Sequence, residues 1–300
     1  SGELVKDDEK QVAQVKNGFA AVGIGKSAPV PVPTTKSTKT STTAPTTTTT
    51  TPTIPSDDTP TVLGDDAMFM AGPAHTGEYD GGGTAPAGDI KWKFDTKGMI
   101  VSNPAVSGNR VYFSAGDSLY GVDIADGENY WKAEGLGALL VSPAVADGMV
   151  YTASGSKNVL YAIDATNGKE MWQSTVAAKV TTNITVADGT VYFGGGDSYY
   201  YAVDGKTGKE KWKFKTGYEA HVTPSVADGV VYFGGGWSVG VGTMPDSIDK
   251  YLYAVDAATG KEKWKVTTVG GVDGTPAISG GSVFFGGWDG NVYAMDVKTG

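Results

Sequence analysis

The sequence predicts an all-β protein: a β-propeller of five four-stranded blades, closed end to end and preceded by an extended Thr/Pro-rich N-terminal tail. Three observations predict it. A unit of about 40 residues recurs five times from Gly88 onward, each unit contains only short strand-like runs, and a strand missing from the last unit precedes the first. Strand-only repeats of this length are typical of propeller blades.

Each repeat carries an aspartate, a glycine four residues later and, in four repeats, a tryptophan four residues after the glycine. The aspartates are Asp123, Asp164, Asp204, Asp256 and Asp296, and the tryptophans are Trp131, Trp172, Trp212 and Trp264. Glycine permits positive φ, the aspartate can bond turn amides, and indole offers a flat apolar face with one N–H donor. We expect structural docking by these residues, with ligand stacking by the tryptophans as the alternative.

Each unit contains four runs that are typical of short strands. Examples are Ser142–Val145, Val191–Phe193, Tyr201–Val203 and Lys211–Phe214. The last run alternates polar and apolar residues, and Asp-Gly or Thr-Gly pairs between runs predict hairpin turns.

The two ends of the repeat region predict a closed ring. The fifth repeat stops at Gly300, before the place where its tryptophan would stand. Residues 89–96 (DIKWKFDT), with Trp92, match residues 209–216 (KEKWKFKT). We expect residues 89–96 to complete the fifth blade and so remove two exposed sheet edges. Further blades after Gly300 are the alternative.

The first 66 residues predict two segments ahead of the propeller. Residues 29–66 are a Thr/Pro-rich linker with too little apolar surface to offset the entropy of folding. Residues 1–28 are an N-terminal segment, a donor strand or an anchor, that can add as a strand to a neighbouring molecule. The residues expected to make this subunit linkage are Val12, Val15, Phe19, Val22 and Ile24.

Threonine-rich tracts often carry O-glycans at a cell surface. The candidate glycosylation sites are Thr46, Thr47, Thr48, Thr49, Thr50 and Thr51, together with Asn183 in the single sequon of the chain. An unmodified linker is the alternative.

Composition excludes several classes of function. Lys and Arg total 24 against 33 acidic residues, with no basic stripe, which argues against a nucleic-acid partner. The absence of cysteine removes disulfides and thiolate metal sites. No apolar run is long enough to cross a membrane. With only His75 and His221 present, a two-histidine metal site is disfavoured.

The fourth repeat is longer than the others, because residues 238–249 (SVGVGTMPDSID) are added to it. Such a loop projects from one face of a propeller, where partners often bind. The candidate contact residues are Trp237, Met244, Pro245, Asp246 and Trp288. A tolerated loop insertion is the alternative.

The pattern Ala-x-Asp-x-x-x-Gly-x-x-x-Trp at residues 162–172 and 202–212 resembles the tryptophan-docking motif of the pyrroloquinoline-quinone-like (PQQ-like) repeat propellers. The segment 68–77 (MFMAGPAHTG) resembles the lead-in to the first blade of that family. The resemblance covers residues 67–300 and implies a propeller domain there. Propellers of this family usually carry seven or eight blades, and the first repeat here has Gly121 in place of alanine.

Quinone-dependent dehydrogenases of that family hold their cofactor with calcium, an adjacent-cysteine disulfide and a catalytic aspartate. Because this chain has no cysteine and its repeat aspartates are turn residues, we expect a member of the non-catalytic branch without cofactor or metal. The expected function is that of a secreted or cell-surface structural subunit of a filament or surface layer. Its tail would link it to copies of itself or to envelope proteins. The alternatives are an envelope scaffold that binds protein or glycan partners and a quinone-dependent dehydrogenase.

Overall fold

The computed structural model describes residues 90–236 and 248–300, all of which lie in the unit Thr59–Gly300, one of two units of the chain. The boundaries expected at residues 28 and 66 fall outside these described residues, as do the proposed linkage residues and threonine glycosylation sites. Within the described part, no helix is long and apolar enough to span a membrane.

The described residues form five antiparallel sheets. The first blade contains β1 (Ala105–Ser107), β2 (Arg110–Ala115), β3 (Ser118–Asp123) and β4 (Asn129–Ala133). The second contains β5 (Ala144–Ala146), β6 (Met149–Ser154), β7 (Val159–Asp164) and β8 (Glu170–Thr175). The third contains β9 (Thr185–Ala187), β10 (Thr190–Gly194), β11 (Tyr199–Asp204) and β12 (Glu210–Lys215). The fourth contains β13 (Ser225–Ala227), β14 (Val230–Gly234), β15 (Tyr251–Asp256) and β16 (Glu262–Thr267). The fifth contains β17 (Ala277–Ser279), β18 (Ser282–Gly286) and β19 (Val292–Asp296).

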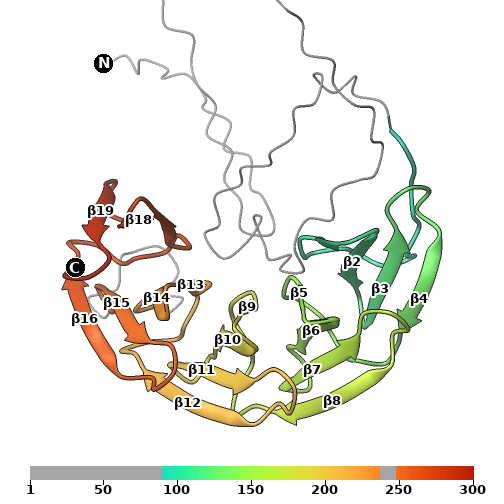
Figure 1. Cartoon of the computed structure of the whole chain (residues 1–300), viewed down its shortest axis with the longest axis horizontal. Helices are drawn as coiled ribbons and strands as arrows, with labels where there is room; N and C mark the ends of the chain where they lie inside the picture. Colours follow the sequence, from blue (N-terminus) through green and yellow to red (C-terminus); the bar gives the residue numbers. More distant parts are fainter. Residues whose placement is uncertain (1–89, 237–247) are drawn as a thin grey trace, which may run out of the picture. The chain divides into compact units, whose positions relative to one another are not determined.

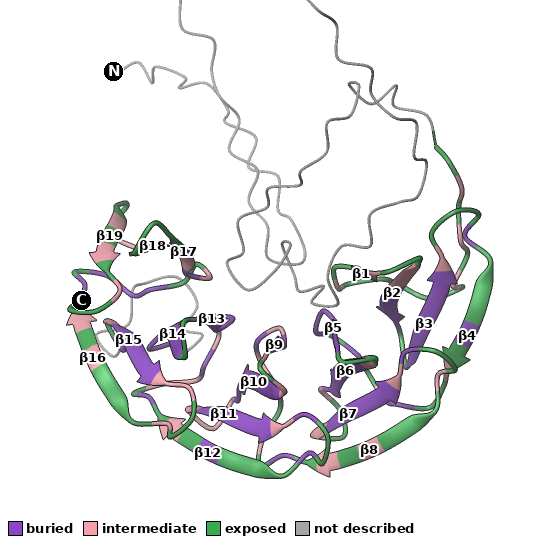
Figure 2. Cartoon of the chain, viewed as in Figure 1, coloured by how far each residue is buried: buried purple, intermediate pink, exposed green. Residues whose placement is uncertain are grey.

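In every blade the strands pair in sequence order, from a short inner strand to the outer rim. The blades follow one another along an arc, with the first and fifth blades at its two ends (Figure 1). In the first four blades the two middle strands are largely buried and the outer strands β4, β8, β12 and β16 are largely exposed, whereas β18 and β19 of the fifth blade are partly exposed (Figure 2). Within an outer strand such as β12, buried or half-buried residues alternate with exposed ones, which explains why the fourth run of each unit alternates polar and apolar residues.

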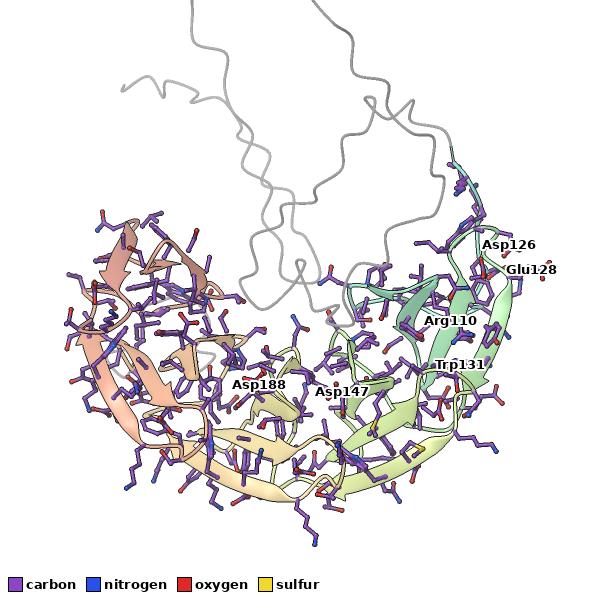
Figure 3. All side chains as sticks on the ribbon, viewed as in Figure 1. Arg110, Asp126, Glu128, Trp131, Asp147 and Asp188 are labelled. Carbon is purple, nitrogen blue, oxygen red and sulfur yellow. The ribbon has the colours of Figure 1, made fainter. Side chains whose placement is uncertain are left out.

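The Asp-Gly pairs form two-residue turns between the first and second strands of three blades. Asp147 and Gly148 both have positive φ, as do Asp188 with Gly189 and Asp228 with Gly229. Positive φ at both central residues is the geometry of a type I′ turn, which matches the twist of the flanking strands. The Asp147 and Asp188 turns lie on neighbouring blades (Figure 3).

The hydrophobic core is divided among the contacts between blades. One cluster joins Tyr151 of the second blade to Phe193 of the third, and another joins Tyr192 of the third to Phe233 of the fourth. The fold is therefore stabilised by sheet-on-sheet packing around the arc, and each blade depends on its neighbours.

The expected closure of the ring is not found in the structure. Among the described residues the fifth sheet has three strands, and β19 pairs only with β18. Val292 of β19 is 82% exposed. Residues 90–96 lie beside the first blade, at the opposite end of the arc (Figure 1).

The physical reason is that residues 90–96 satisfy only one of the two contacts made by an outer strand. Trp92 docks on the first blade, and Phe94 packs on Phe113 and Tyr120. The match to the repeat identifies the position of this segment within a blade. The match does not identify the sheet against which the segment pairs. In the structure the two ends of the arc lie apart, so β19 does not reach residues 90–96 (Figure 1).

Candidate functional sites

The repeat tryptophans connect each outer strand to the following blade. In each case Nε1 donates a hydrogen bond to the backbone oxygen of the residue after the repeat aspartate. The bonds run from Trp92 to Ile124 (3.0 Å), Trp131 to Ala165 (2.9 Å), Trp172 to Gly205 (2.9 Å), Trp212 to Ala257 (2.8 Å) and Trp264 to Val297 (3.1 Å). Trp131 lies where the first and second blades meet (Figure 3).

The repeat glycines receive the indole rings. Gly168 has a φ of +72°, and a Cβ added to it would lie 2.8 Å from the ring of Trp131. Gly208 has a φ of +68°, and its added Cβ would lie 2.6 Å from Trp172. Both the backbone conformation and the close approach of the ring therefore require glycine.

Gly121 has a similar role in the first blade. It is the cross-strand partner of Trp131, and an added Cβ would lie 2.6 Å from the indole ring. Glycine in place of alanine at position 121 therefore allows Trp131 to approach the backbone closely. The repeat pattern alone did not indicate this role for Gly121.

The repeat aspartates bind their own turns. The Asp204 carboxylate accepts from the backbone N and the hydroxyl of Thr207, and Asp256 accepts in the same way from Thr259. These bonds, led by those from the threonine hydroxyls, lower the pKa of both carboxyl groups. In the remaining repeats, Asp123 accepts from Ala125 N, Asp164 from Thr166 N, and Asp296 from Lys298 N and Thr299 N.

Polar side chains also join the inner ends of the blades. The hydroxyl of Ser142 accepts from Asn103 N at 3.0 Å, and Ser142 N donates to Asn183 Oδ1 at 2.9 Å. Asn183 N in turn donates to Thr223 Oγ1 at 3.3 Å. This chain of bonds spans the first four blades. Sequence reasoning missed it, because the participating residues differ from one blade to the next.

The geometry of the Asn183 sequon bears on its proposed glycosylation. The side-chain oxygen of Asn183 is used between blades, and Thr185 is fully buried with its hydroxyl donating to Pro224 O at 2.6 Å. A glycan on Asn183 would have to be accommodated next to these contacts.

A second set of carboxylates lies in the turns before the third strands. Asp197, Asp249 and Asp289 each accept a hydrogen bond from the tyrosine four residues later, which is Tyr201, Tyr253 or Tyr293. Asp249 is buried and also accepts from Gly217 N at 2.7 Å. Burial, followed by the charge and hydrogen bond of Asp249, raises the pKa of Tyr253.

Asp249 therefore corrects the expected extent of the insertion. It stands four residues before Tyr253, as Asp197 stands before Tyr201, so it belongs to the repeat and not to the added loop. Of the proposed contact residues, Trp237, Met244, Pro245 and Asp246 lie outside the described residues. Trp288 is half-buried before β19, and its backbone N donates to Gly271 O at 2.9 Å.

An apolar groove of about 310 Å³ lies over the loops that lead into the first and second blades. We use "apolar groove" for the hollow lined by Met99, Val101, Gly116, Asp117, Ala138, Leu139 and Leu140. Met99 is 76% exposed and Leu140 is 49% exposed, whereas Leu139 is buried beneath them. Sequence reasoning missed this surface, since these residues are far apart along the chain.

Among the described residues no group of three His, Cys, Asp or Glu side chains is arranged to hold a metal ion. His75 lies outside the described residues, and His221 Nε2 lies 3.5 Å from the carboxylate of Glu219.

A family model described as "Outer membrane protein assembly factor BamB" matches residues 83–137, 156–240 and 247–300. The chain belongs to this family of PQQ-like repeat proteins. A search of curated proteins gave no match.

Solved structures share the fold. BamB from Moraxella catarrhalis is similar with a TM-score of 0.56 and 18% identity, over 71% of this chain and 66% of that one. Quinohemoprotein alcohol dehydrogenase ADHIIG from Pseudomonas putida HK5 has a TM-score of 0.56 and 21% identity, over 70% of this chain and 42% of that one. A europium-containing methanol dehydrogenase has a TM-score of 0.59 and 16% identity, over 70% of this chain and 51% of that one.

The chain thus spans about two thirds of the BamB structure and about half or less of the two dehydrogenases. These likenesses establish the propeller fold, and an activity has to be argued from the sites of this chain.

Proposed function

We propose that this protein is a non-enzymatic propeller scaffold of the cell envelope or cell surface that acts by binding other proteins. The apolar groove carries the proposal. Contiguous exposed apolar side chains on a soluble surface are a signal of protein contact. The description of the family as an outer-membrane assembly factor supports a place in the envelope.

The polar residues of the repeat favour binding over catalysis. The repeat aspartates bond the amides and hydroxyls of their own turns, and the tryptophans bond the next blade. Their chemistry is thus used to build the propeller. If the protein is instead a quinone-dependent dehydrogenase, adding the quinone and calcium should change its absorption spectrum, whereas a scaffold should give a flat titration.

The apolar groove can be tested with charged variants. Met99→Asp and Leu140→Asp place a carboxylate in the groove, and Met171→Asp is the matched control because Met171 is a half-exposed methionine on β8. Each variant is crosslinked in its native envelope, and the adducts are quantified by mass spectrometry. The proposal predicts one protein adduct that is lost with both groove variants and retained with Met171→Asp. Adducts that are the same in all variants would contradict it, as would glycan adducts alone.

A second candidate function is assembly with copies of itself, as a filament or surface layer. The free side of β19 has no strand partner among the described residues, and residues 90–96 have an outer-strand sequence without a sheet. These two edges are complementary, so residues 90–96 of one copy could complete the fifth blade of the next by strand addition. The segment 1–28 could strengthen the link. Repeated head-to-tail contacts that do not close give filaments.

Self-assembly is tested by sedimentation and electron microscopy of the full chain and of a variant that lacks residues 1–30. Concentration-dependent polymers that shorten in the variant would support this function. A full chain that stays monomeric at every concentration would refute it, while leaving the proposal of a heterologous partner open to the crosslinking test.

A further inference from the structure

The docking tryptophans make five equivalent contacts between blades, and the side chain two residues after the tryptophan differs among them. It is phenylalanine in two contacts and a smaller residue in three, namely Ala133, Ser174 and Val266. The position two residues after the docking tryptophan is Phe94 before the first blade and Phe214 before the fourth, but Ser174 before the third. Cross-strand pairing confirms the equivalence, because Ser174 pairs with Leu160 and Phe214 pairs with Tyr200 at the same register.

In the two contacts with phenylalanine, the ring packs edge-on against a pair of rings in the next blade. Phe94 lies 5.7 Å from Phe113 and 5.5 Å from Tyr120, both at 69°. Phe214 contacts Phe233 and Tyr253 at 5.5 and 5.2 Å, both at 65°. Edge-to-face geometry of this kind is the favoured arrangement of aromatic side chains.

The third blade has the same pair of rings without the third ring. Phe193 and Tyr201 stack at 5.2 Å and 13°, as Phe113 and Tyr120 stack at 5.4 Å and 9°. A pocket of about 310 Å³ lies beside them, with Ser174 in its wall. We call it the ring pocket, and its lining is Ser174, Thr175, Val176, Ala177, Phe193, Tyr201, Val203, Gly208, Glu210 and Lys213.

The second blade shows how a contact without phenylalanine is otherwise filled. There the equivalent residue is Ala133, and the blade presents Thr152 where the third has Phe193. Leu136 is buried in that contact beside Tyr161, whose hydroxyl donates to Leu136 O at 3.2 Å. At the ring pocket the residue that corresponds to Leu136 is Val176, because Val176 N donates to Asn158 O as Leu136 N donates to Asp117 O. Val176 is the smaller side chain, and the pocket that it lines stays open.

We infer that the ring pocket binds a single aromatic ring with a polar substituent, such as a free phenol or a tyrosine side chain. The ring would take the place that Phe94 and Phe214 occupy in the equivalent contacts, edge-on to Phe193 and Tyr201. The volume is sufficient, since an apolar cavity of roughly 150 Å³ holds benzene. The Glu210 and Lys213 side chains, which are exposed and line the pocket, provide partners for a hydroxyl group.

The experiment uses the full chain, with p-cresol as the probe and amide chemical shifts as the readout. Ser174→Phe supplies the missing ring from within, and Ser174→Ala leaves the pocket open as the matched control. Wild type and Ser174→Ala should bind p-cresol with similar, millimolar affinity, and shifts should centre on Phe193 and Tyr201. Ser174→Phe should lose at least about tenfold in affinity because its ring fills the same volume.

Three further comparisons sharpen the test. Phe214→Ser opens the equivalent space before the fourth blade and should add a second p-cresol site. If Phe214→Ser does not fold, the comparison of Ser174→Phe with Ser174→Ala decides the test. Capped Gly-Tyr-Gly that binds more tightly than p-cresol identifies a side chain of a protein as the ligand, and the reverse identifies a free phenol. The inference is overturned if wild type shows no shifts, if Ser174→Phe binds as wild type does, or if methyl glucoside binds and p-cresol does not.

Discussion

The close contact between Trp131 and Gly168 leads to a quantitative prediction for the stability of the variant Gly168→Ala. Alanine at the positive φ of this residue costs about 1–2 kcal/mol in the free energy of unfolding. Its Cβ would also lie 2.8 Å from the Trp131 ring, and such overpacking costs a further 1–3 kcal/mol or so. The expected total destabilisation is about 2–5 kcal/mol.

The matched control is Gly148→Ala in the same blade. Gly148 has a φ of +73°, but no heavy atom lies within 4 Å of its added Cβ. It should therefore lose only the backbone contribution of about 1–2 kcal/mol. The difference between the variants corresponds to roughly 2–12 °C in melting temperature for a domain of this size. Equal melting temperatures by differential scanning calorimetry would refute the docking contact as a source of stability.

Three further predictions concern the hydrogen bonds and buried groups. Trp212→Phe removes the bond to Ala257 O and should cost at least about 1 kcal/mol in chemical denaturation, so an unchanged midpoint would contradict the docking role. Ser142→Ala removes the hydroxyl that accepts from the backbone N of the exposed Asn103 and should cost about 0.5–1.5 kcal/mol, whereas stability equal to wild type would dispute the inner chain of bonds. Burial, reinforced by nearby aspartates, raises the pKa of Tyr151 to about 12. Because unfolded tyrosine titrates near pH 10, this stabilisation is complete below about pH 10 and is lost as the pH rises towards about 12. Tyr151→Phe should weaken that alkaline loss of melting temperature, and an identical pH profile would contradict the assignment.

The repeat made most of the fold predictable from sequence. The spacing of Asp164, Gly168 and Trp172 reports a local unit, and local turns and strand periodicity follow from the residue types within it. The four-stranded sheets and the Asp-Gly hairpin turns therefore agree with the sequence prediction.

Closure was not predictable in the same way. Trp92 identifies an outer strand, but its docking onto Ile124 involves only the blade that follows it. The curvature of the arc depends on how bulky side chains fill each contact between sheets, and that is a property of several blades together. Sequence periodicity carries no information about it.

The candidate sites were only partly predictable for a related reason. The apolar groove joins Met99 to Leu140, and the ring pocket joins Ser174 to Phe193, so both depend on contacts between different repeats. A position-by-position comparison of the repeats would have revealed Ser174 in place of phenylalanine. It would not have revealed whether neighbouring side chains fill the space.

The most direct test of the open arc is an intramolecular distance between residues 90–96 and β19. The chain has no cysteine, so Lys93→Cys and Val292→Cys can carry two spin labels without other changes, and dilution with unlabelled protein removes contacts between copies. An open arc predicts a distance far longer than the separation of neighbouring strands. A distribution centred on paired strands, whose backbones lie roughly 5 Å apart, would contradict it and restore the closed ring.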